Sequence, residues 1–116
     1  MLQKKYRLPA FKIPDLAKTG NRYNSQLFTL VFKKQKKENT KQYSKFAFIV
    51  SKKIDKRATV RNKSKRRLSE GVSDSLSKIK PCYNVLILAK KRLMTTNYQT
   101  TRSELRKVFK KVKLFC

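Results

Sequence analysis

Residues 56–79 carry a stripe of side chains at helical spacing whose chemistry changes part-way along. Arg57, Arg61 and Lys65 recur every four residues, so they share one face of a helix. Four apolar residues continue nearly the same face: Leu68, Val72, Leu76 and Ile79. Because burial of unpaired charge is costly, we expect the second half of this helix to pack on a sheet. The first half then projects its charges beyond the sheet edge.

Two residues bear on how this helix begins and packs. Asp55 stands at its front, where a carboxylate favours the helix start as a cap or as a counter-charge to the dipole. Gly71 lies in its interior and costs about 1 kcal/mol relative to Ala. This glycine indicates either a break or close packing against a neighbour.

Three apolar runs of strand length, 26–32, 46–50 and 85–89, predict a sheet, with the polar loop 33–41 joining the first two as a hairpin. Alternation gives each strand two faces. We expect the bulkier face to form the core, with Phe28, Leu30, Phe32, Phe46, Phe48, Val50, Leu86 and Leu88. The smaller face carries Leu27, Thr29, Val31, Ala47, Ile49, Val85, Ile87 and Ala89. That face either floors a groove or is covered by the N-terminal segment.

Two more helices are predicted. Residues 13–20 suit a short one, with Pro14 in its first turn and Gly20 just past its end. Thr96 and Gln99 have capping-box spacing before an amphipathic pattern that runs to Phe115. A strand–helix–strand crossover within one sheet implies a two-layer α/β sandwich with helices on one face. No repeat or linker marks a boundary, so we expect one domain, 1–116.

The charge balance points to a polyanionic partner. Lys and Arg number 32 against 6 acidic residues, a formal net charge of +26. Such a field repels itself unless an anion lies beside it, and nucleic acid is the strongest candidate. A disordered cationic chain is the alternative. However, 39% hydrophobic residues and only 2 glycines favour a folded core.

Protein-based catalysis and metal binding find little support. The chain has no His, its acidic residues are scattered, and 2 glycines cannot form a phosphate-binding loop. We therefore expect no catalytic residue and no metal ligand. Cys82 and Cys116 lack metal spacing and suit the free thiols of a cytoplasmic protein. No apolar stretch has the length of a membrane span or a signal peptide, so we expect no membrane role.

The sequence resembles the bacterial ribonuclease P protein subunit. In that family a strand ending in Ser-Lys-Lys leads through a short turn into a helix bearing Arg-Asn-x-x-Lys-Arg. Here Ser51-Lys52-Lys53 is followed at the same distance by residues 61–66, Arg-Asn-Lys-Ser-Lys-Arg. The match extends over nearly the whole chain, including Phe28-x-Leu30 and Leu88-Ala89-Lys90 in two of the predicted strands.

The resemblance implies a fold and a role. The fold is α+β in αβββαβα order, with a left-handed βαβ crossover, similar to the second domain of a small-subunit ribosomal protein. The role is that of the protein component of a ribonucleoprotein endoribonuclease. One such protein binds one catalytic RNA and the 5′ leader of precursor tRNA, whose removal gives the mature 5′ end. The RNA performs the hydrolysis with its own bound Mg²⁺, and the protein needs no cofactor.

The resemblance also implies two binding surfaces. We call the first the basic cluster; it would contact the catalytic RNA through Lys52, Lys53, Arg57, Arg61, Asn62, Lys63, Lys65 and Arg66. Arg can bridge phosphate oxygens, and Asn can hydrogen-bond a ribose or a base edge. We call the second the leader groove; it would be formed by Ile13, Ala17, Thr29, Val31, Ala47 and Ile49, with Lys53 at its border.

The chain departs from the family pattern in both surfaces. A basic residue usual three positions past Arg66 is Ser69 here, with Arg67 as a substitute pointing elsewhere. Aromatics usual in the groove are replaced by Ile13, Ala17 and Val31, which weakens base stacking unless Phe11 or Tyr23 substitutes. Two other classes share the size and charge. One is a structural ribosomal RNA-binding protein, and the other is a small nucleoid protein that would need base-reading side chains.

Overall fold

The computed structural model of the chain describes residues 3–35, 43–80 and 82–114. Three α-helices, α1 (Ile13–Thr19), α2 (Ala58–Ser75) and α3 (Tyr98–Lys111), surround a four-stranded sheet. The strands are β1 (Asn21–Asn24), β2 (Phe28–Lys34), β3 (Lys45–Ile49) and β4 (Tyr83–Ala89). Single 3₁₀ turns are η1 (Lys4–Tyr6), η2 (Ala10–Lys12), η3 (Leu76–Lys78) and η4 (Lys91–Thr95). The order αβββαβα agrees with the prediction, and none of the described helices could span a bilayer.

The sheet order is β1-β2-β4-β3, which corrects the predicted hairpin. β2 pairs with β1 and β4 in antiparallel fashion, whereas β3 runs parallel to β4 and also forms a bridge from Phe46 to Arg7 of the N-terminal segment. β2 and β3 are therefore not neighbours, because β4 lies between them. The β3–α2–β4 unit is the crossover expected from the strand–helix–strand order.

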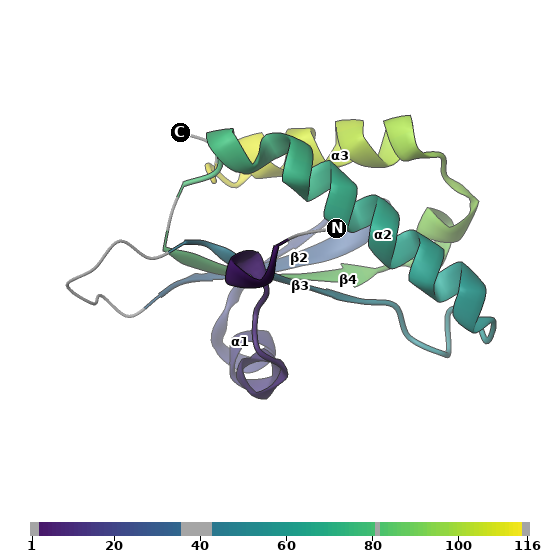
Figure 1. Cartoon of the computed structure of the whole chain (residues 1–116), viewed down its shortest axis with the longest axis horizontal. Coiled ribbons are helices and arrows are strands. Elements are labelled where there is room, and N and C mark those ends of the chain that lie inside the picture. The colour runs from purple at the N-terminus through teal and green to yellow at the C-terminus, as the bar shows by residue number, and fades with distance from the viewer. Residues whose placement is uncertain (1–2, 36–42, 81, 115–116) are drawn as a thin grey trace.

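The main core lies between the sheet and the pair α2 and α3 (Figure 1). The register places Leu30 opposite Ile87, and both side chains point into this core. The predicted faces of the last strand were therefore wrong, as was the face of Leu27. Val85, Ile87, Ala89 and Leu27 belong to the main core, and Leu86 and Leu88 lie on the opposite face. Side-chain size suggested the wrong assignment, whereas backbone pairing decides which residues share a face.

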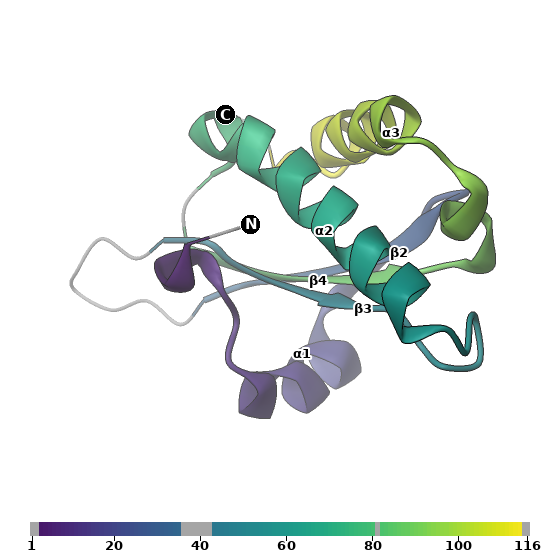
Figure 2. The same cartoon turned by 45° about the vertical axis from the view of Figure 1, so that its right-hand side comes forward.

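α1 covers that opposite face, together with Leu8 of the segment before it (Figure 2). The prediction that all helices share one face therefore holds for α2 and α3 only. Leu16 of α1 packs with Leu8, Val31 and Leu86, all of them buried. A Cβ on Gly20 would lie 2.7 Å from the Leu16 carbonyl oxygen and 2.8 Å from Val31 Cγ1. Glycine is thus required here by the close approach of α1 to β2.

The two long helices start differently from the predictions. Asn97, not Thr96, caps α3, because its side-chain oxygen accepts a hydrogen bond from the Thr100 N–H at 2.8 Å. Arg57 occupies the N-cap position of α2, so Asp55 is not the cap, but Asp55 Oδ1 accepts a hydrogen bond from the Arg57 N–H at 2.9 Å, which keeps its negative charge beside the helix start. Gly71 allows close helix packing, since a Cβ there would lie 2.4 Å from Leu105 Cδ1 on α3. The helix does not break at this glycine.

Candidate nucleic-acid interface

The first half of α2 is free of the core. Every buried residue of the helix lies at Ser64 or beyond it. In Figure 1 the first turns of α2 extend past the end of β3, as the change from basic to apolar residues predicted. Asn62, Lys63 and Arg66 are exposed, and Arg61 and Lys65 are half-buried. The structure thus brings the helical members of the basic cluster together on one projecting rod.

The turn before α2 contributes the remaining members. Lys52 and Lys53 are exposed in the segment that links β3 to α2. The Ser51 hydroxyl accepts a hydrogen bond from the Lys53 N–H at 3.1 Å, and the Ser51 carbonyl accepts one from the Ile54 N–H at 3.0 Å. This local turn holds the two lysines beside the start of the helix.

Asp55 fixes the position of Arg57. Its Oδ1 accepts hydrogen bonds from the Arg57 N–H at 2.9 Å and from Nε at 3.1 Å, and its Oδ2 pairs with Nη2 at 2.9 Å. These bonds from Arg57 lower the pKa of Asp55 from 3.8 to about 2. The Arg57 side chain itself stays largely exposed, so the pair orients the guanidinium without burying it.

Among the described residues, no other member of the basic cluster forms an ion pair. The described residues contain two ion pairs, Arg57 with Asp55 and Arg102 with Asp74. Arg61 also has a buried Nε with no hydrogen-bond partner in that part of the chain. A buried donor without an acceptor costs free energy. An anion such as phosphate would supply both the missing charge and the missing acceptor.

Arg67 does not replace the basic residue that Ser69 lacks. Its Nη1 donates a hydrogen bond to the Thr96 carbonyl at 2.7 Å, which ties α2 to the segment before α3. Ser69 is itself buried. The projecting cluster therefore ends at Arg66.

The predicted leader groove is only partly open. Val31 has no exposed surface, because α1 covers it, so it cannot touch a ligand in this arrangement. Ile13, Ala17, Ala47 and Ile49 are half-buried around the same cluster, and Thr29 is half-buried with its hydroxyl bonded to Asn24 Oδ1 at 2.9 Å. Both expectations for this face hold in part, since α1 covers its centre and leaves partly exposed apolar atoms around it. Leu88, assigned to the core from its size, also belongs to this partly exposed set.

The two aromatic candidates for the groove differ. Tyr23 lies opposite Leu30 and packs against the main core, so it is on the wrong face of the sheet. Phe11 precedes α1 in η2 and is 78% exposed. An exposed aromatic beside an apolar surface is suited to stacking on a base. Phe11 is thus the aromatic that can serve this side of the molecule.

Comparisons with known proteins agree on one family. The family model described as Ribonuclease P matches residues 2–113. The ribonuclease P protein component of Fusobacterium nucleatum is 35% identical over 99 residues, which cover 82% of this chain and 85% of that protein. Among solved structures, the RNase P protein of Staphylococcus aureus has a TM-score of 0.81 at 21% identity, covering 96% of this chain and 98% of that one. The Thermotoga maritima RNase P protein gives 0.78 at 24% identity, covering 90% and 96%.

Proposed function

The chain belongs to the ribonuclease P protein family, and on that premise we propose that the basic cluster docks on the catalytic RNA while the α1 side of the sheet holds the 5′ leader. The protein works with the catalytic RNA and precursor tRNA as the protein subunit of ribonuclease P. The ribosomal and nucleoid alternatives gain no support from these relatives.

The projecting half of α2 supports the proposal that the basic cluster docks on the catalytic RNA. Its cations after Arg57 form no ion pair among the described residues, so they can approach a phosphate surface without disturbing the fold. Arg61 and Arg66 can each bridge two phosphate oxygens, and the exposed amide of Asn62 can bond a ribose hydroxyl. Turning of the Arg61 side chain toward a phosphate would give its buried Nε the acceptor that the free protein lacks.

The α1 side of the sheet has features that suit it to hold the 5′ leader. An RNA strand there would meet Ala47, Ile49 and Ile13 at the edge of the apolar surface, with Phe11 available for stacking. Lys53 lies in the turn between β3 and α2, so we expect its charge to border both surfaces. Leader contacts would thus depend on one exposed aromatic and on backbone charge more than on a deep pocket.

The chemistry belongs to the RNA subunit on this proposal. We infer that Mg²⁺ is bound by the RNA and that this chain contributes affinity and orientation. The protein would act in the cytoplasm, where precursor tRNA is made. No residue of the basic cluster then needs to take part in bond cleavage.

The decisive experiment is reconstitution with the catalytic RNA at low magnesium. The unchanged protein should restore cleavage of precursor tRNA. Arg61→Ala combined with Lys65→Ala should weaken binding to the catalytic RNA, because two phosphate contacts are removed. The slope of log affinity against log salt should become shallower by about 2.

A matched control removes the same charge elsewhere. Lys107→Ala with Lys111→Ala deletes two exposed cations, also four residues apart, from α3. This variant should keep a salt slope close to that of the unchanged protein. Equal changes in both double variants would mean that affinity follows net charge alone, and the assignment to α2 would fail.

A further inference from the structure

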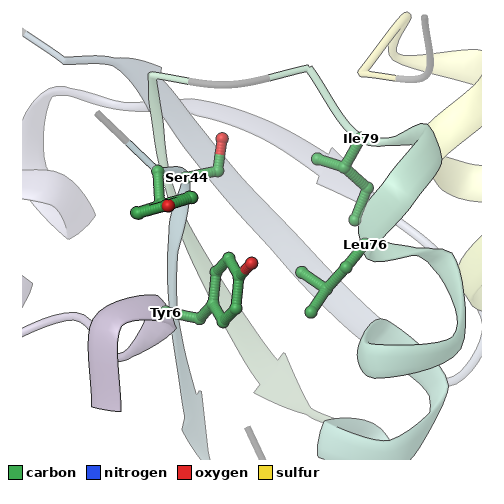
Figure 3. A pocket seen from close by; sticks show the side chains of 5 residues that line it. Tyr6, Ser44, Leu76 and Ile79 are labelled. Carbon is green, nitrogen blue, oxygen red and sulfur yellow. The ribbon is translucent and has the colours of Figure 1, made fainter. Parts of the chain in front are cut away.

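A site with aromatic and basic residues lies near the C-terminal end of α2, at the opposite end of the helix from the basic cluster. A cavity of about 200 Å³ is lined by Tyr6, Tyr43, Ser44, Leu76 and Ile79 (Figure 3). Leu76 directly follows α2, so the cavity is about 25 Å along the helix from its basic start. Pockets for drug-sized ligands measure roughly 300–1,000 Å³. This cavity therefore suits a single ring better than a whole cofactor.

Two tyrosines line the cavity, and a lysine lies over their rings. The rings of Tyr6 and Tyr43 meet edge to face, with their centroids 5.3 Å apart. Lys5 Nζ lies 4.6 Å from the centroid of Tyr43 and 5.2 Å from that of Tyr6. Tyr43 is 50% exposed and, with Phe11, is one of two exposed large hydrophobic side chains among the described residues. Figure 3 shows the Tyr6 ring rising between Ser44 and Leu76.

The site is held rigidly by hydrogen bonds between distant segments. The Ser44 hydroxyl donates to the Lys80 carbonyl at 2.6 Å and accepts from the Tyr83 N–H at 3.0 Å. Gln35 Nε2 donates to the Tyr43 carbonyl at 3.0 Å. The N-terminal segment is joined to β3 through the Leu8 N–H and the Phe46 carbonyl at 2.9 Å. The tyrosines are thus preorganised rather than carried on a free tail.

Basic residues lie beside part of the cavity. Lys5 lies over both tyrosine rings, and Lys78 and Lys80 flank Ile79 in the sequence. The nearest acidic residue along α2, Asp74, is turned toward α3, where it pairs with Arg102 at 3.2 Å and accepts a hydrogen bond from Tyr98 at 2.6 Å. A negatively charged ligand with an aromatic ring matches both features.

We propose that this cavity binds one unpaired nucleotide of an RNA strand, with its base against Tyr6 and Tyr43 and its phosphate beside Lys5. Stacking on aromatic side chains holds single-stranded nucleic acid without strong base preference, and lysines supply the phosphate contact. The site is distinct from both surfaces assigned above, because it lies on the α2 face of the sheet and at the far end of that helix. The proposal shares only the premise that the protein binds RNA.

A structural role explains Tyr6 better than it explains Tyr43. Tyr6 packs against the main core, so it would cover the edge of that core even without a ligand. Tyr43 leaves half of its surface in solvent and is not part of either apolar cluster. Tyr43 is therefore the residue to change.

The test uses the full-length protein and a single-stranded oligouridylate of about six nucleotides that carries one photoreactive 4-thiouridine. Irradiation followed by mass spectrometry of the peptides should find a crosslink at Tyr6 or Tyr43. The yield at that peptide, measured against RNA concentration, gives the affinity of this site separately from the others. Tyr43→Leu should weaken it about tenfold, and Tyr43→Phe should preserve it. Lys5→Gln should weaken it less and make it less sensitive to salt.

Two controls separate this proposal from the assignments above. Phe11→Leu changes the other exposed aromatic and should leave the crosslink at Tyr43 in place. Arg61→Ala with Lys65→Ala should lose catalytic-RNA affinity and also keep that crosslink. Crosslinks at Phe11 or α2 alone, or an unchanged affinity in a folded Tyr43→Leu protein, would overturn the site and leave the proposed function standing. Equal yield with a duplex of the same sequence would also overturn it, because paired bases cannot stack on the tyrosines.

Discussion

The two halves of α2 share one helix and one continuous stripe of side chains but have different surroundings. From Ser64 onward the helix has six buried residues, two of which, Leu68 and Val72, belong to the main core, and before Ser64 it has none. Leu68 and Val72 are fully buried against the sheet and α3, whereas Asn62 and Lys63 face solvent. The helix is anchored at one end so that the other end can present charge at a fixed angle.

This contrast teaches how a small protein can hold a dense cationic surface in place. A basic tail would lose conformational entropy whenever it bound RNA. A helix whose far half is locked in the core has already lost that freedom on folding. The stability of the anchored half and the affinity of the projecting half should therefore respond to different substitutions.

Leu68→Ala should have the largest effect on stability. The side chain is fully buried, and its removal leaves a cavity in the main core, so the free energy of unfolding should fall by about 2–5 kcal/mol. Val60→Ala is the matched change in the projecting half, where Val60 belongs to neither apolar cluster. It should alter stability by no more than about 0.5 kcal/mol. Chemical denaturation of both variants measures the difference, and similar losses would contradict the division of the helix at Ser64.

Much of the fold follows from local patterns. The position of α2 and the change of its stripe depend on residues near one another in sequence, whereas the close packing at Gly71 is against Leu105 of α3. The strand β1, Asn21–Asn24, gave no such signal, because it is a polar edge strand that needs only backbone pairing with β2. The insertion of β4 between β2 and β3 was also missed. Alternation shows which residues of one strand share a face, but not which strand pairs with it or in which register, and the register decides which faces of the two strands coincide.

The candidate site also has features that local patterns predict and features that depend on contacts between distant residues. The exposed cations of α2 could be predicted, because helical spacing alone brings them together. The burial of Val31 depends on α1 docking across the sheet, which no local pattern states. The bond from Arg67 to Thr96 joins residues 29 positions apart and was equally hidden. Contacts of this kind decide which of several similar cations is available to a ligand.

Arg66 and Arg67 are adjacent but have different surroundings, so replacing each one tests the same division between anchoring and RNA binding. We expect effects of intermediate size. Arg67→Gln should lower the free energy of unfolding by about 1 kcal/mol, because the Thr96 carbonyl loses a charged donor at 2.7 Å. Arg66→Gln removes the same charge from an exposed position and should leave stability nearly unchanged. Catalytic-RNA affinity should show the reverse order. Arg66→Gln should weaken binding severalfold and make the salt slope shallower by about 1, and Arg67→Gln should leave the slope unaltered. Indistinguishable salt slopes would mean that position on the helix does not matter.

The smallest effect concerns the junction before α2 and appears only in acid. The pKa of Asp55 is lowered from 3.8 to about 2 by its bonds to Arg57, so the pair stabilises the folded state wherever Asp55 is ionised. Its contribution is complete above the unfolded pKa and is lost as the pH falls through the folded value. Asp55→Asn should therefore lower the melting temperature slightly near neutral pH, and the gap from the unchanged protein should close between about pH 4 and pH 2. Asp15→Asn is the control, since its carboxylate takes part in no ion pair among the described residues. A gap that persisted at the acid end would show that Asp55 supports the turn through its shape rather than its charge, and Arg57 would then be held by the backbone alone.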